Sequence, residues 1–464
     1  MNAVDTAAQA AAQAFRAYAR TTPAQRARLL RAIADGIEQL GDELVICVNR
    51  ETALPVARII GERARTCMQL RLFADLAERD EWIDARMDPA DAQRTPPKPQ
   101  VRSQLRPIGP VAVFAASNFP LAFSVAGGDT AAALAVGCPV VVKTHPAHPE
   151  TAMLVAEVVR VAVHKCALPS GVFSLVADSS RASSVALVQH PSIKAGAFTG
   201  SLQGGMALWR AAQQRDEPIP FFAEMGSVNP IFLFPQALAR DLDFIAAGLH
   251  ASMTLGVGQF CTQPGLIFLV DTVASRAFID KLAALVSATA PAEMLSPLIC
   301  ANYRHGVETR AAAAGVRTLA RVDAGSSAQG GDRQGGAALF ATDADTFCAK
   351  RELWEEVFGP SSLVVLCKSE DDFVRCAASL PGQLTAAIWS GSDQPGDSDL
   401  LWTLEQKAGR IVFDGFPTGV EVGTAMMHGG PFPATSDSRF TSVGTRAIQR
   451  FVRPIAWQTA AGNS

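Results

Sequence analysis

One cysteine, Cys261, lies in the glycine-rich stretch GVGQFCTQPG (256–265), and no other cysteine occurs within thirty residues of it. A thiolate attacks a carbonyl carbon when it is accessible and a neighbouring group can accept the thiol proton. The glycines would let backbone N–H groups approach the carbonyl that is attacked. The stretch therefore indicates a nucleophile, although most cysteines in proteins are inert core residues.

Two other polar residues follow or end predicted strands. Asn118 lies in ASNFPLAF after the strand 111–117, and Glu224 ends the strand 220–224 in FFAEMGS. Ligands of open α/β proteins bind at the carboxyl ends of the strands. There an amide can donate to an oxyanion, and a carboxylate whose pKa is raised by apolar walls can act as a general base. The alternatives are a turn-forming Asn and a solvated Glu at the end of a strand.

The signals for a cofactor are less direct, because the chain has no GxGxxG motif. FTGSLQGG (198–205) reads as a strand, a Gly/Ser turn and the start of a helix, which is a place for a phosphate. The strand PVVVK (139–143) ends in Lys143, and no acid follows before Glu150. An NAD-binding strand usually ends in an acid that binds the ribose 2′-hydroxyl, so this cation favours the 2′-phosphate of NADP.

The elements that position these residues show two patterns of apolar residues along the chain. Residues 5–86 show helical spacing and are followed by a polar, Pro-rich loop at 88–100. From residue 111 onwards, apolar strands alternate with helices, and a second such series starts near residue 229. This alternation predicts an α/β protein with parallel sheets covered on both faces. A Gly/Ser-rich surface loop is expected at 322–338.

Composition excludes several classes of protein. The 464 residues carry a net charge of −3 and scattered basic residues, so neither nucleic acid nor an anionic membrane is an expected partner. The longest apolar run, 131–142, is shorter than the ~20 residues that span a bilayer. The start MNAVDTAAQA lacks the features of a signal peptide. The nine cysteines contain no CxxC pair, which favours free thiols in a reducing cytoplasm and no bound metal.

Together these segments resemble the aldehyde dehydrogenase superfamily over nearly the whole chain. The motifs that carry the resemblance occur in the order and approximate spacing of that family: ASNFPLAF, VVVKTHPAHPETA, FTGS, AEMGSVNP, GVGQFCTQPG and EEVFGP. The resemblance implies a Rossmann-type cofactor domain (1–87 and 107–226) and an α/β catalytic domain (227–440). It also implies a small β oligomerisation flap (88–106 and 441–464) and a homodimer or homotetramer.

The resemblance also assigns roles by position. Cys261 matches the nucleophile, Glu224 the general base, and Asn118 with the Cys261 N–H the oxyanion hole. The residues that match the cofactor site are Lys143 at the adenosine ribose, Gly200 and Ser201 near the pyrophosphate, Met225 and Gly226 after the general base, and Glu356 and Phe358 at the nicotinamide ribose. The implied cofactor is NADP, with NAD as a weaker alternative.

Three departures from the common family pattern are Ser117, Pro146 and Ser227. With GQFCTQPG and the C-terminal segment from MMHGGPFP onward, they resemble the α-ketoglutaric semialdehyde dehydrogenase branch. That branch implies oxidation of 2,5-dioxopentanoate to 2-oxoglutarate, and Arg439 and Ser442 are candidates for binding the far end of this substrate. A branch acting on long-chain fatty aldehydes shares part of the pattern.

Two readings from other classes remain. A Cys–His hydrolase or acyltransferase would need a histidine held against Cys261, and the seven histidines offer no motif for one. His145 and His148 lie in the expected cofactor segment, and His428 lies in a C-terminal HGGPFP loop. The other reading is a non-catalytic scaffold or binding protein of the same fold.

Overall fold

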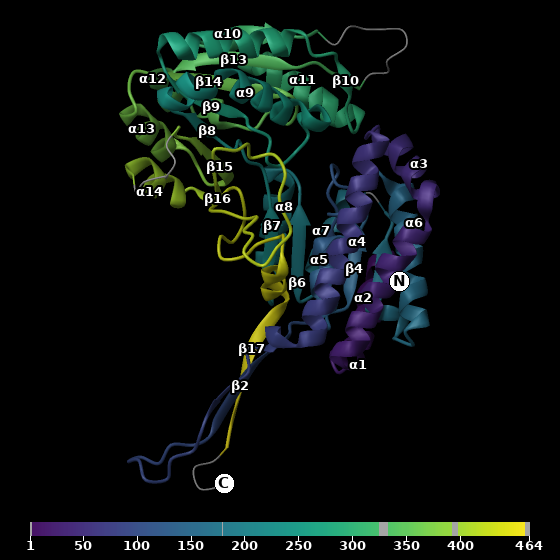
Figure 1. Cartoon of the computed structure of the whole chain (residues 1–464). Helices are drawn as coiled ribbons and strands as arrows, with labels where there is room; N and C mark the ends of the chain where they lie inside the picture. Colours follow the sequence, from purple (N-terminus) through teal and green to yellow (C-terminus); the bar gives the residue numbers. More distant parts are fainter. Residues whose placement is uncertain (1, 179, 324–332, 392–397, 460–464) are drawn as a thin grey trace.

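The computed structural model describes residues 2–178, 180–323, 333–391 and 398–459. It contains two α/β units and a projecting β-ribbon (Figure 1). Most of the expected Gly/Ser loop at 322–338 lies outside the described residues, as do the last residues of the expected flap.

The first sheet has five parallel strands in the order β5-β4-β3-β6-β7. Its strands are short and almost entirely buried, because helices cover both faces, and this explains why they read as continuous apolar runs. The strand bounds are β3 Val111–Phe114, β4 Val140–Lys143, β5 Phe173–Val176, β6 Ala195–Thr199 and β7 Phe221–Glu224. The helices between them are α5 Gly128–Val136, α6 Pro149–Lys165, α7 Arg181–Gln189 and α8 Leu202–Gln213.

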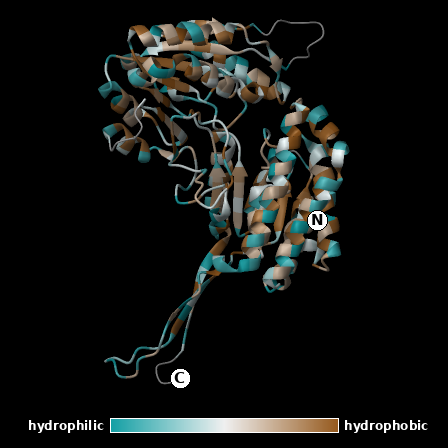
Figure 2. Ribbon diagram, in the orientation of Figure 1, coloured by the Kyte–Doolittle hydropathy of each residue, from teal (hydrophilic) through white to brown (hydrophobic). Residues whose placement is uncertain are grey.

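The expected N-terminal helical region is confirmed as four helices that pack beside this sheet (Figure 1). Their apolar faces join α5 and the strands in one core, while their outer faces stay polar (Figure 2). The bounds are α1 Ala3–Tyr18, α2 Pro23–Gln39, α3 Gly41–Thr52 and α4 Val56–Arg79.

The second sheet has seven strands in the order β11-β13-β14-β9-β8-β15-β16, and only the edge strand β11 is antiparallel to its neighbour. The strands are β8 Ile231–Leu233, β9 Leu266–Val270, β11 Arg317–Arg321, β13 Ala338–Asp343, β14 Ser361–Cys367, β15 Gln383–Trp389 and β16 Ala408–Phe413. The helices are α9 Pro235–Thr254, α10 Val273–Ser287, α11 Pro297–Ala312, α12 Ala344–Ala349, α13 Asp371–Ser379 and α14 Asp399–Glu405. A two-residue strand pair, β10 Ala292–Glu293 with β12 Gln334–Gly335, lies beside it.

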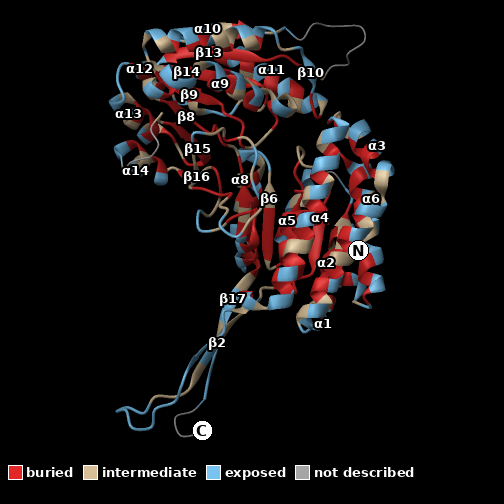
Figure 3. Ribbon diagram, viewed as in Figure 1, coloured by how far each residue is buried: buried red, intermediate tan, exposed pale blue. Residues whose placement is uncertain are grey.

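The β-ribbon consists of β1 Arg86–Asp88, β2 Val101–Pro107 and β17 Val452–Gln458. Strand β2 pairs antiparallel with both neighbours, so the N-terminal and C-terminal parts of the chain meet here. The ribbon projects from the body, and many of its residues are exposed (Figure 3).

The carboxyl ends of the first-sheet strands point toward the second unit (Figure 2). After β16, residues 414–444 return from the second sheet to the first. Thr435 forms a bridge with Glu224, and the Met225 N–H donates to the Ala434 carbonyl at 2.8 Å. This returning segment therefore closes over the strand ends of the first sheet. In the described part of the chain, no helix is long and apolar enough to cross a membrane.

Candidate active site

The glycine-rich stretch before Cys261 forms a left-handed turn that leads from α9 toward β9. Gly256, Val257 and Gly258 have φ values of 56°, 57° and 64°. This region is costly for a β-branched residue such as Val257, and packing must hold it. A Cβ on Gly258 would lie 2.3 Å from the Gly359 carbonyl carbon. Gly258 thus allows the turn to pack against the segment after Phe358.

The partly exposed Cys261 thiol faces two buried groups. Its Sγ lies 3.5 Å from His428 Nε2, and the same Nε2 lies 2.8 Å from Glu224 Oε1. The second Glu224 oxygen accepts a hydrogen bond from Ser442 Oγ at 2.6 Å. Cys261 Sγ, His428 Nε2 and Glu224 Oε1 therefore form a contiguous proton-sharing group.

The seven histidines offer no sequence motif for one held against Cys261, but the structure places His428 there. His428 and Glu224 are 204 residues apart, and His428 lies in the returning segment. Its backbone N–H donates to Thr441 Oγ1 at 2.9 Å, which fixes the loop. The only sequence signal was the following glycine pair, whose backbone packs against the carbonyls of Gln383 and Phe440 where no side chain fits.

Burial and the Glu224 carboxylate raise the pKa of the Cys261 thiol well above its ordinary value. Burial would also raise the pKa of Glu224, but the nearby His428 and hydrogen bonds from His428, Ser442 and Cys261 outweigh it and leave this pKa below the ordinary value. Glu224 is thus held as a carboxylate. The raised pKa we expected from its apolar walls is not found, because these donors stabilise the charge.

Asn118 lies in the loop after β3, beside the thiol. Its Nδ2 donates to the carbonyl of Gln259, two residues before Cys261, at 3.1 Å. The Cys261 carbonyl accepts a hydrogen bond from Asn229 Nδ2 at 2.9 Å. These bonds hold the two expected oxyanion donors, the Asn118 amide and the Cys261 N–H, in adjacent loops.

Ser227, one departure from the family pattern, supports this loop. Its hydroxyl lies 2.9 Å from Gln383 Oε1, which also accepts the N–H groups of Val228 and Asn229. The residues in this network are buried, and Asn229 Nδ2 in turn donates to the Cys261 carbonyl. The serine therefore ties β15 of the second sheet to the nucleophile loop.

Lys143 ends β4 as predicted, and its Nζ donates to the Thr144 carbonyl at 3.2 Å. Burial lowers the pKa of Lys143, and Asp178 partly offsets this shift. Asp178 follows β5, whose last residue pairs with Lys143. The expectation that Lys143 has no acid beside it is therefore wrong, because the acid comes from the neighbouring strand and not from the residues that follow Lys143.

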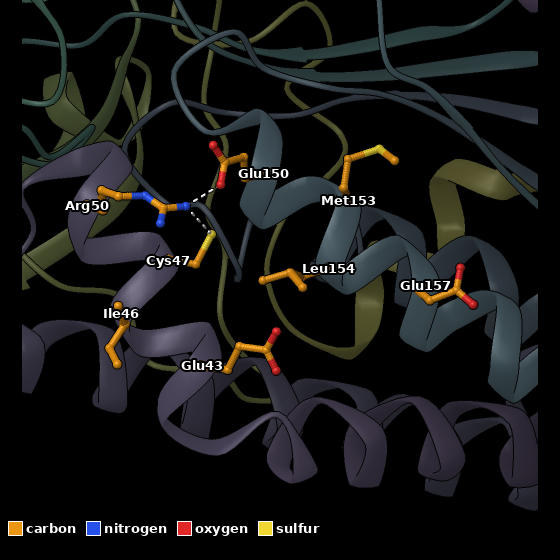
Figure 4. A pocket seen from close by; sticks show the side chains of 8 residues that line it. All are labelled: Glu43, Ile46, Cys47, Arg50, Glu150, Met153, Leu154 and Glu157. Atoms are coloured by element: carbon orange, nitrogen blue, oxygen red, sulfur yellow. Dashed lines mark hydrogen bonds and ion pairs between the residues drawn. The ribbon is translucent and has the colours of Figure 1, made fainter.

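Glu150, the first acid after Lys143 in the sequence, points into a groove between α3 and α6. There it forms an ion pair with Arg50, next to Cys47 (Figure 4). Burial also lowers the pKa of His145 to about 3, with smaller contributions from His148 and Lys143. Neither His145 nor Glu150 therefore brings a charge to the end of β4.

The turn at Gly200 and Ser201 begins α8, and both residues are exposed. Ser201 is the N-cap of α8, and its Oγ accepts from the Gly204 N–H at 3.2 Å. The buried Thr199 Oγ1 at the end of β6 has no hydrogen-bond partner among the described residues. An exposed helix N-terminus beside an unused hydroxyl suits the phosphates of a dinucleotide.

The remaining predicted cofactor residues lie between the two units. Met225 is buried against Gly205, so only its backbone could meet a cofactor. A Cβ on Gly226 would lie 2.8 Å from Glu356 Oε2, so the glycine leaves room for this carboxylate. Protein around the Glu356 carboxylate raises its pKa to about 7. Phe358 packs against the core of the first unit.

Of the two candidates for binding the far end of the substrate, neither is suitably placed. Arg439 is exposed and forms an ion pair with Asp437 at 2.6 Å. Ser442 is bound to Glu224 and belongs to the catalytic group.

The donor atoms of Glu224, Cys261 and His428 all lie within 4.8 Å of one another, so this group has the donor set that Zn²⁺ prefers.

Comparison with known proteins shows the family of this chain. The sequence profile of the aldehyde dehydrogenase family matches residues 1–399. An α-ketoglutaric semialdehyde dehydrogenase 2 from Azospirillum brasilense is 50% identical over 98% of this chain and 86% of its own length. An α-ketoglutaric semialdehyde dehydrogenase from Acinetobacter baylyi is 46% identical over 99% of this chain and 87% of its own.

Solved structures share the fold. A betaine aldehyde dehydrogenase from Staphylococcus aureus superposes with a TM-score of 0.84 at 20% identity, covering 100% of this chain and 89% of that one. The HpcC protein from Thermus thermophilus superposes with a TM-score of 0.83 at 24% identity, covering 98% and 85%. The expected α/β fold is thus confirmed, and the chain belongs to the aldehyde dehydrogenase family and is an NAD(P)-dependent oxidoreductase.

Proposed function

We propose that this enzyme oxidises 2,5-dioxopentanoate to 2-oxoglutarate with NADP, through a thioester on Cys261. The observation that carries the catalytic part is the contact of one histidine nitrogen with both the thiol and the general base. The two α-ketoglutaric semialdehyde dehydrogenases that share 46–50% of the sequence support the substrate.

Glu224, with His428 held against it, is the group that takes the thiol proton. A thiol next to a carboxylate resists ionisation, so the proton needs a nearby acceptor before Cys261 can attack. The Glu224 carboxylate accepts a hydrogen bond from Cys261, and His428 Nε2 lies against both Cys261 Sγ and Glu224 Oε1 and donates to the carboxylate. His428 Nδ1 is buried without a partner in the described part of the chain, so Nε2 is the ring nitrogen that serves the site.

The thiolate adds to the aldehyde carbon, and the new oxyanion receives hydrogen bonds from Asn118 Nδ2 and the Cys261 N–H. A bound nicotinamide would supply the acceptor for the hydride that this adduct loses when it becomes a thioester. Glu224 and His428 then remove a proton from water, which attacks the thioester and releases the acid. The thiol is regenerated in this step.

The residues that would hold the cofactor fit such a group. Lys143 would bind the adenosine ribose, the turn at Gly200 and Ser201 would bind the pyrophosphate, and Glu356, next to Gly226, would accept hydrogen bonds from the nicotinamide ribose hydroxyls. Met225 would contribute backbone groups, and Phe358 would form one wall of the site. The unused Thr199 hydroxyl and the space over Gly226 support this arrangement.

The preference for NADP rests on the end of β4. Lys143 supplies a cation, Pro146 occupies a position where an acid would repel the 2′-phosphate, and Arg50 holds Glu150 away. Asp178 acts in the opposite direction, although both its oxygens accept hydrogen bonds from Ser180. We expect a tenfold preference at most, roughly 1.4 kcal/mol.

We propose the domain boundaries expected from the resemblance: 1–87 and 107–226 for the cofactor domain, 227–440 for the catalytic domain, and 88–106 with 441–464 for the flap. The positions of the two large sheets support the first two. The ribbon strands themselves begin at Arg86 and Val452, and Thr445–Phe451 packs into the core of the first unit. The exposed ribbon, with β17 as a free edge strand in the described sheet, supports a homodimer or homotetramer in which a second copy covers it.

A steady-state panel tests the proposal. It compares kcat/KM for 2,5-dioxopentanoate, succinic semialdehyde, pentanal and decanal, each with NADP and NAD. We expect 2,5-dioxopentanoate with NADP to be the best pair. A preference for decanal would assign the enzyme to the fatty-aldehyde branch, and no turnover with any aldehyde would favour a scaffold. An NAD preference above threefold would refute the cofactor assignment, and Asp178→Asn should increase the use of NADP.

A further inference from the structure

One face of helix α4 runs alongside the loops that hold the nucleophile. It presents Arg58, Glu62, Arg65 and Gln69, which are spaced as neighbours on one helical face. Glu62 Oε1 accepts the N–H groups of Leu121 and Ala122, in the loop that contains Asn118. This end of the face therefore touches the expected oxyanion loop.

Arg65 touches the other loop beside the thiol. Its Nη1 donates to the carbonyl of Val420 in the returning segment. The neighbouring residues of that segment bond to Thr262, next to Cys261: Thr418 Oγ1 donates to the Thr262 carbonyl, and the Gly419 N–H donates to Thr262 Oγ1, each at 3.3 Å. Arg65 is thus placed between the two loops that flank the nucleophile. Burial lowers its pKa, and the charges of Glu62, Glu421 and Cys261 partly offset this shift.

The guanidinium of Arg65 is not fully used by the protein. It is half-buried, forms no ion pair with a described residue, and its buried Nε has no hydrogen-bond partner there. One helical turn further, the buried Gln69 Nε2 is a second donor without an acceptor among these residues. Buried donors are almost always satisfied, so two such groups on one face indicate a missing acceptor.

The surroundings of this face are apolar. Phe119, Phe123, Val420, Val422 and Met426 belong to one hydrophobic cluster, and Phe119 packs edge-on against Phe260, the residue before Cys261. Glu421, between Val420 and Val422, acts on Arg65 through its charge, but it is exposed and forms no ion pair with Arg65. An apolar collar with a cation suits an aldehyde whose other end carries a carboxylate. A cation–carboxylate contact gains strength where water is excluded.

Two other arginines near the site are already occupied. Arg58 forms an ion pair with Glu62 at 2.7 Å and stacks on the Phe119 ring. Arg410 donates to Thr385 Oγ1 and to the carbonyls of Gly419 and Pro417, so its guanidinium holds the returning segment in place. Among these three, Arg65 is the guanidinium with a free buried donor.

We propose that Arg65 is the residue that selects the substrate, by binding the carboxylate at the end of the molecule opposite the aldehyde. This inference rests on the proposed function. Gln69 supports it as a donor to the same end, and the collar binds the carbon chain between. The enzyme then distinguishes acid-bearing aldehydes from plain ones by a single cation on α4.

The test measures kcat/KM for 2,5-dioxopentanoate and for pentanal, an uncharged aldehyde of the same chain length, in wild type, Arg65→Met, Arg65→Lys and Arg58→Met. We expect Arg65→Met to lower the ratio of the two values by about 10- to 100-fold, mainly through KM for the acid. Arg65→Lys should restore part of it. Arg58→Met is the matched control and should change both substrates alike. Glutarate, a dicarboxylate without an aldehyde, should inhibit wild type competitively and Arg65→Met about tenfold more weakly.

The outcomes separate the two claims. If wild type shows no preference for 2,5-dioxopentanoate over pentanal, the proposed substrate is wrong. If wild type shows the preference but Arg65→Met keeps the same ratio and the same inhibition by glutarate, Arg65 only anchors Val420 and the inference is overturned. Melting temperatures of all variants identify any loss that is due to unfolding, and the ratio of two substrates is insensitive to the fraction of folded enzyme.

Discussion

The two sides of this active site consist of different kinds of structure. On one side, Glu224, Lys143 and the Gly200 turn lie at the ends of parallel strands of the first sheet. On the other, His428, Ser442 and Val420 come from the irregular returning segment, 414–444. The strand-end groups are fixed by the sheet itself, whereas the loop groups depend on a few hydrogen bonds. We infer that the strand-end side supplies the catalytic groups and that the loop side adjusts their reactivity.

The largest effect should come from the nucleophile, which both sides serve. Cys261→Ala should lower the rate by more than about 10³-fold, because no other group can form the thioester. Cofactor binding, followed by fluorescence quenching, should be unchanged. Cys348→Ala is the matched control, since this thiol is also partly exposed but lies in α12 of the second unit. Retention of more than a few per cent of the rate by Cys261→Ala would refute the assignment.

The next largest effect on turnover should come from the loop side of the site. His428→Asn should slow turnover by about 10²-fold, in the range of general acid–base catalysis. Because burial and Glu224 raise the pKa of Cys261, the thiolate forms only as the pH rises. Loss of His428 should move the rising limb of the pH–rate profile further to high pH. Ser442→Ala removes one of the hydrogen bonds to Glu224 and should have a smaller effect. A slower His428→Asn enzyme with an unshifted profile would mean that His428 only packs.

The contact between the two sides also predicts inhibition by zinc. Zn²⁺ should inhibit by binding Cys261, His428 and Glu224 together, and a chelator should reverse it. His428→Asn should weaken this inhibition by about tenfold or more, since it removes the loop ligand, whereas Mg²⁺ should have no effect on either enzyme. Equal inhibition of both enzymes by Zn²⁺ would place the ion elsewhere.

The smallest effect concerns the cofactor. Surrounding protein raises the pKa of Glu356 to about 7, although the residue is exposed, so its protonated fraction should change between pH 6 and pH 8. The carboxylate accepts better than the acid, so the Kd for the cofactor should rise several-fold as the pH falls from 8 to 6. In Glu356→Gln the Kd should be higher and nearly independent of pH. Titration calorimetry measures both, and a pH-independent Kd in wild type would contradict this role.

The difference between the two sides also sets what a sequence can predict. Strand ends in α/β proteins meet at one edge, so Glu224 and Asn118 could be placed near Cys261 from the alternation of strands and helices. Gly200 and Ser201 began a helix as expected. These inferences depend on local patterns, which the chain must satisfy within a few residues.

The rest depends on contacts between distant segments. Asp178 faces Lys143 because β5 lies next to β4, and His428 faces Cys261 because residues 414–444 fold back. Arg439 was a candidate because it carries a positive charge, but it forms an ion pair with Asp437, two residues away. Arg65 was overlooked because a helix full of arginines reads as a solvated surface, and only its position against Val420 distinguishes it.

The returning segment has a consequence for how such enzymes diversify. The family profile matches residues 1–399, and this part of the chain includes Asn118, Glu224, Cys261 and Glu356. His428, Ser442 and Val420 all follow it, on one continuous stretch that no strand of the two large sheets includes. A laboratory graft of residues 414–444 between relatives could therefore exchange the histidine beside the nucleophile, together with Val420, Val422 and Met426 of the substrate collar, in a single step, and leave Asn118, Glu224 and Cys261 untouched.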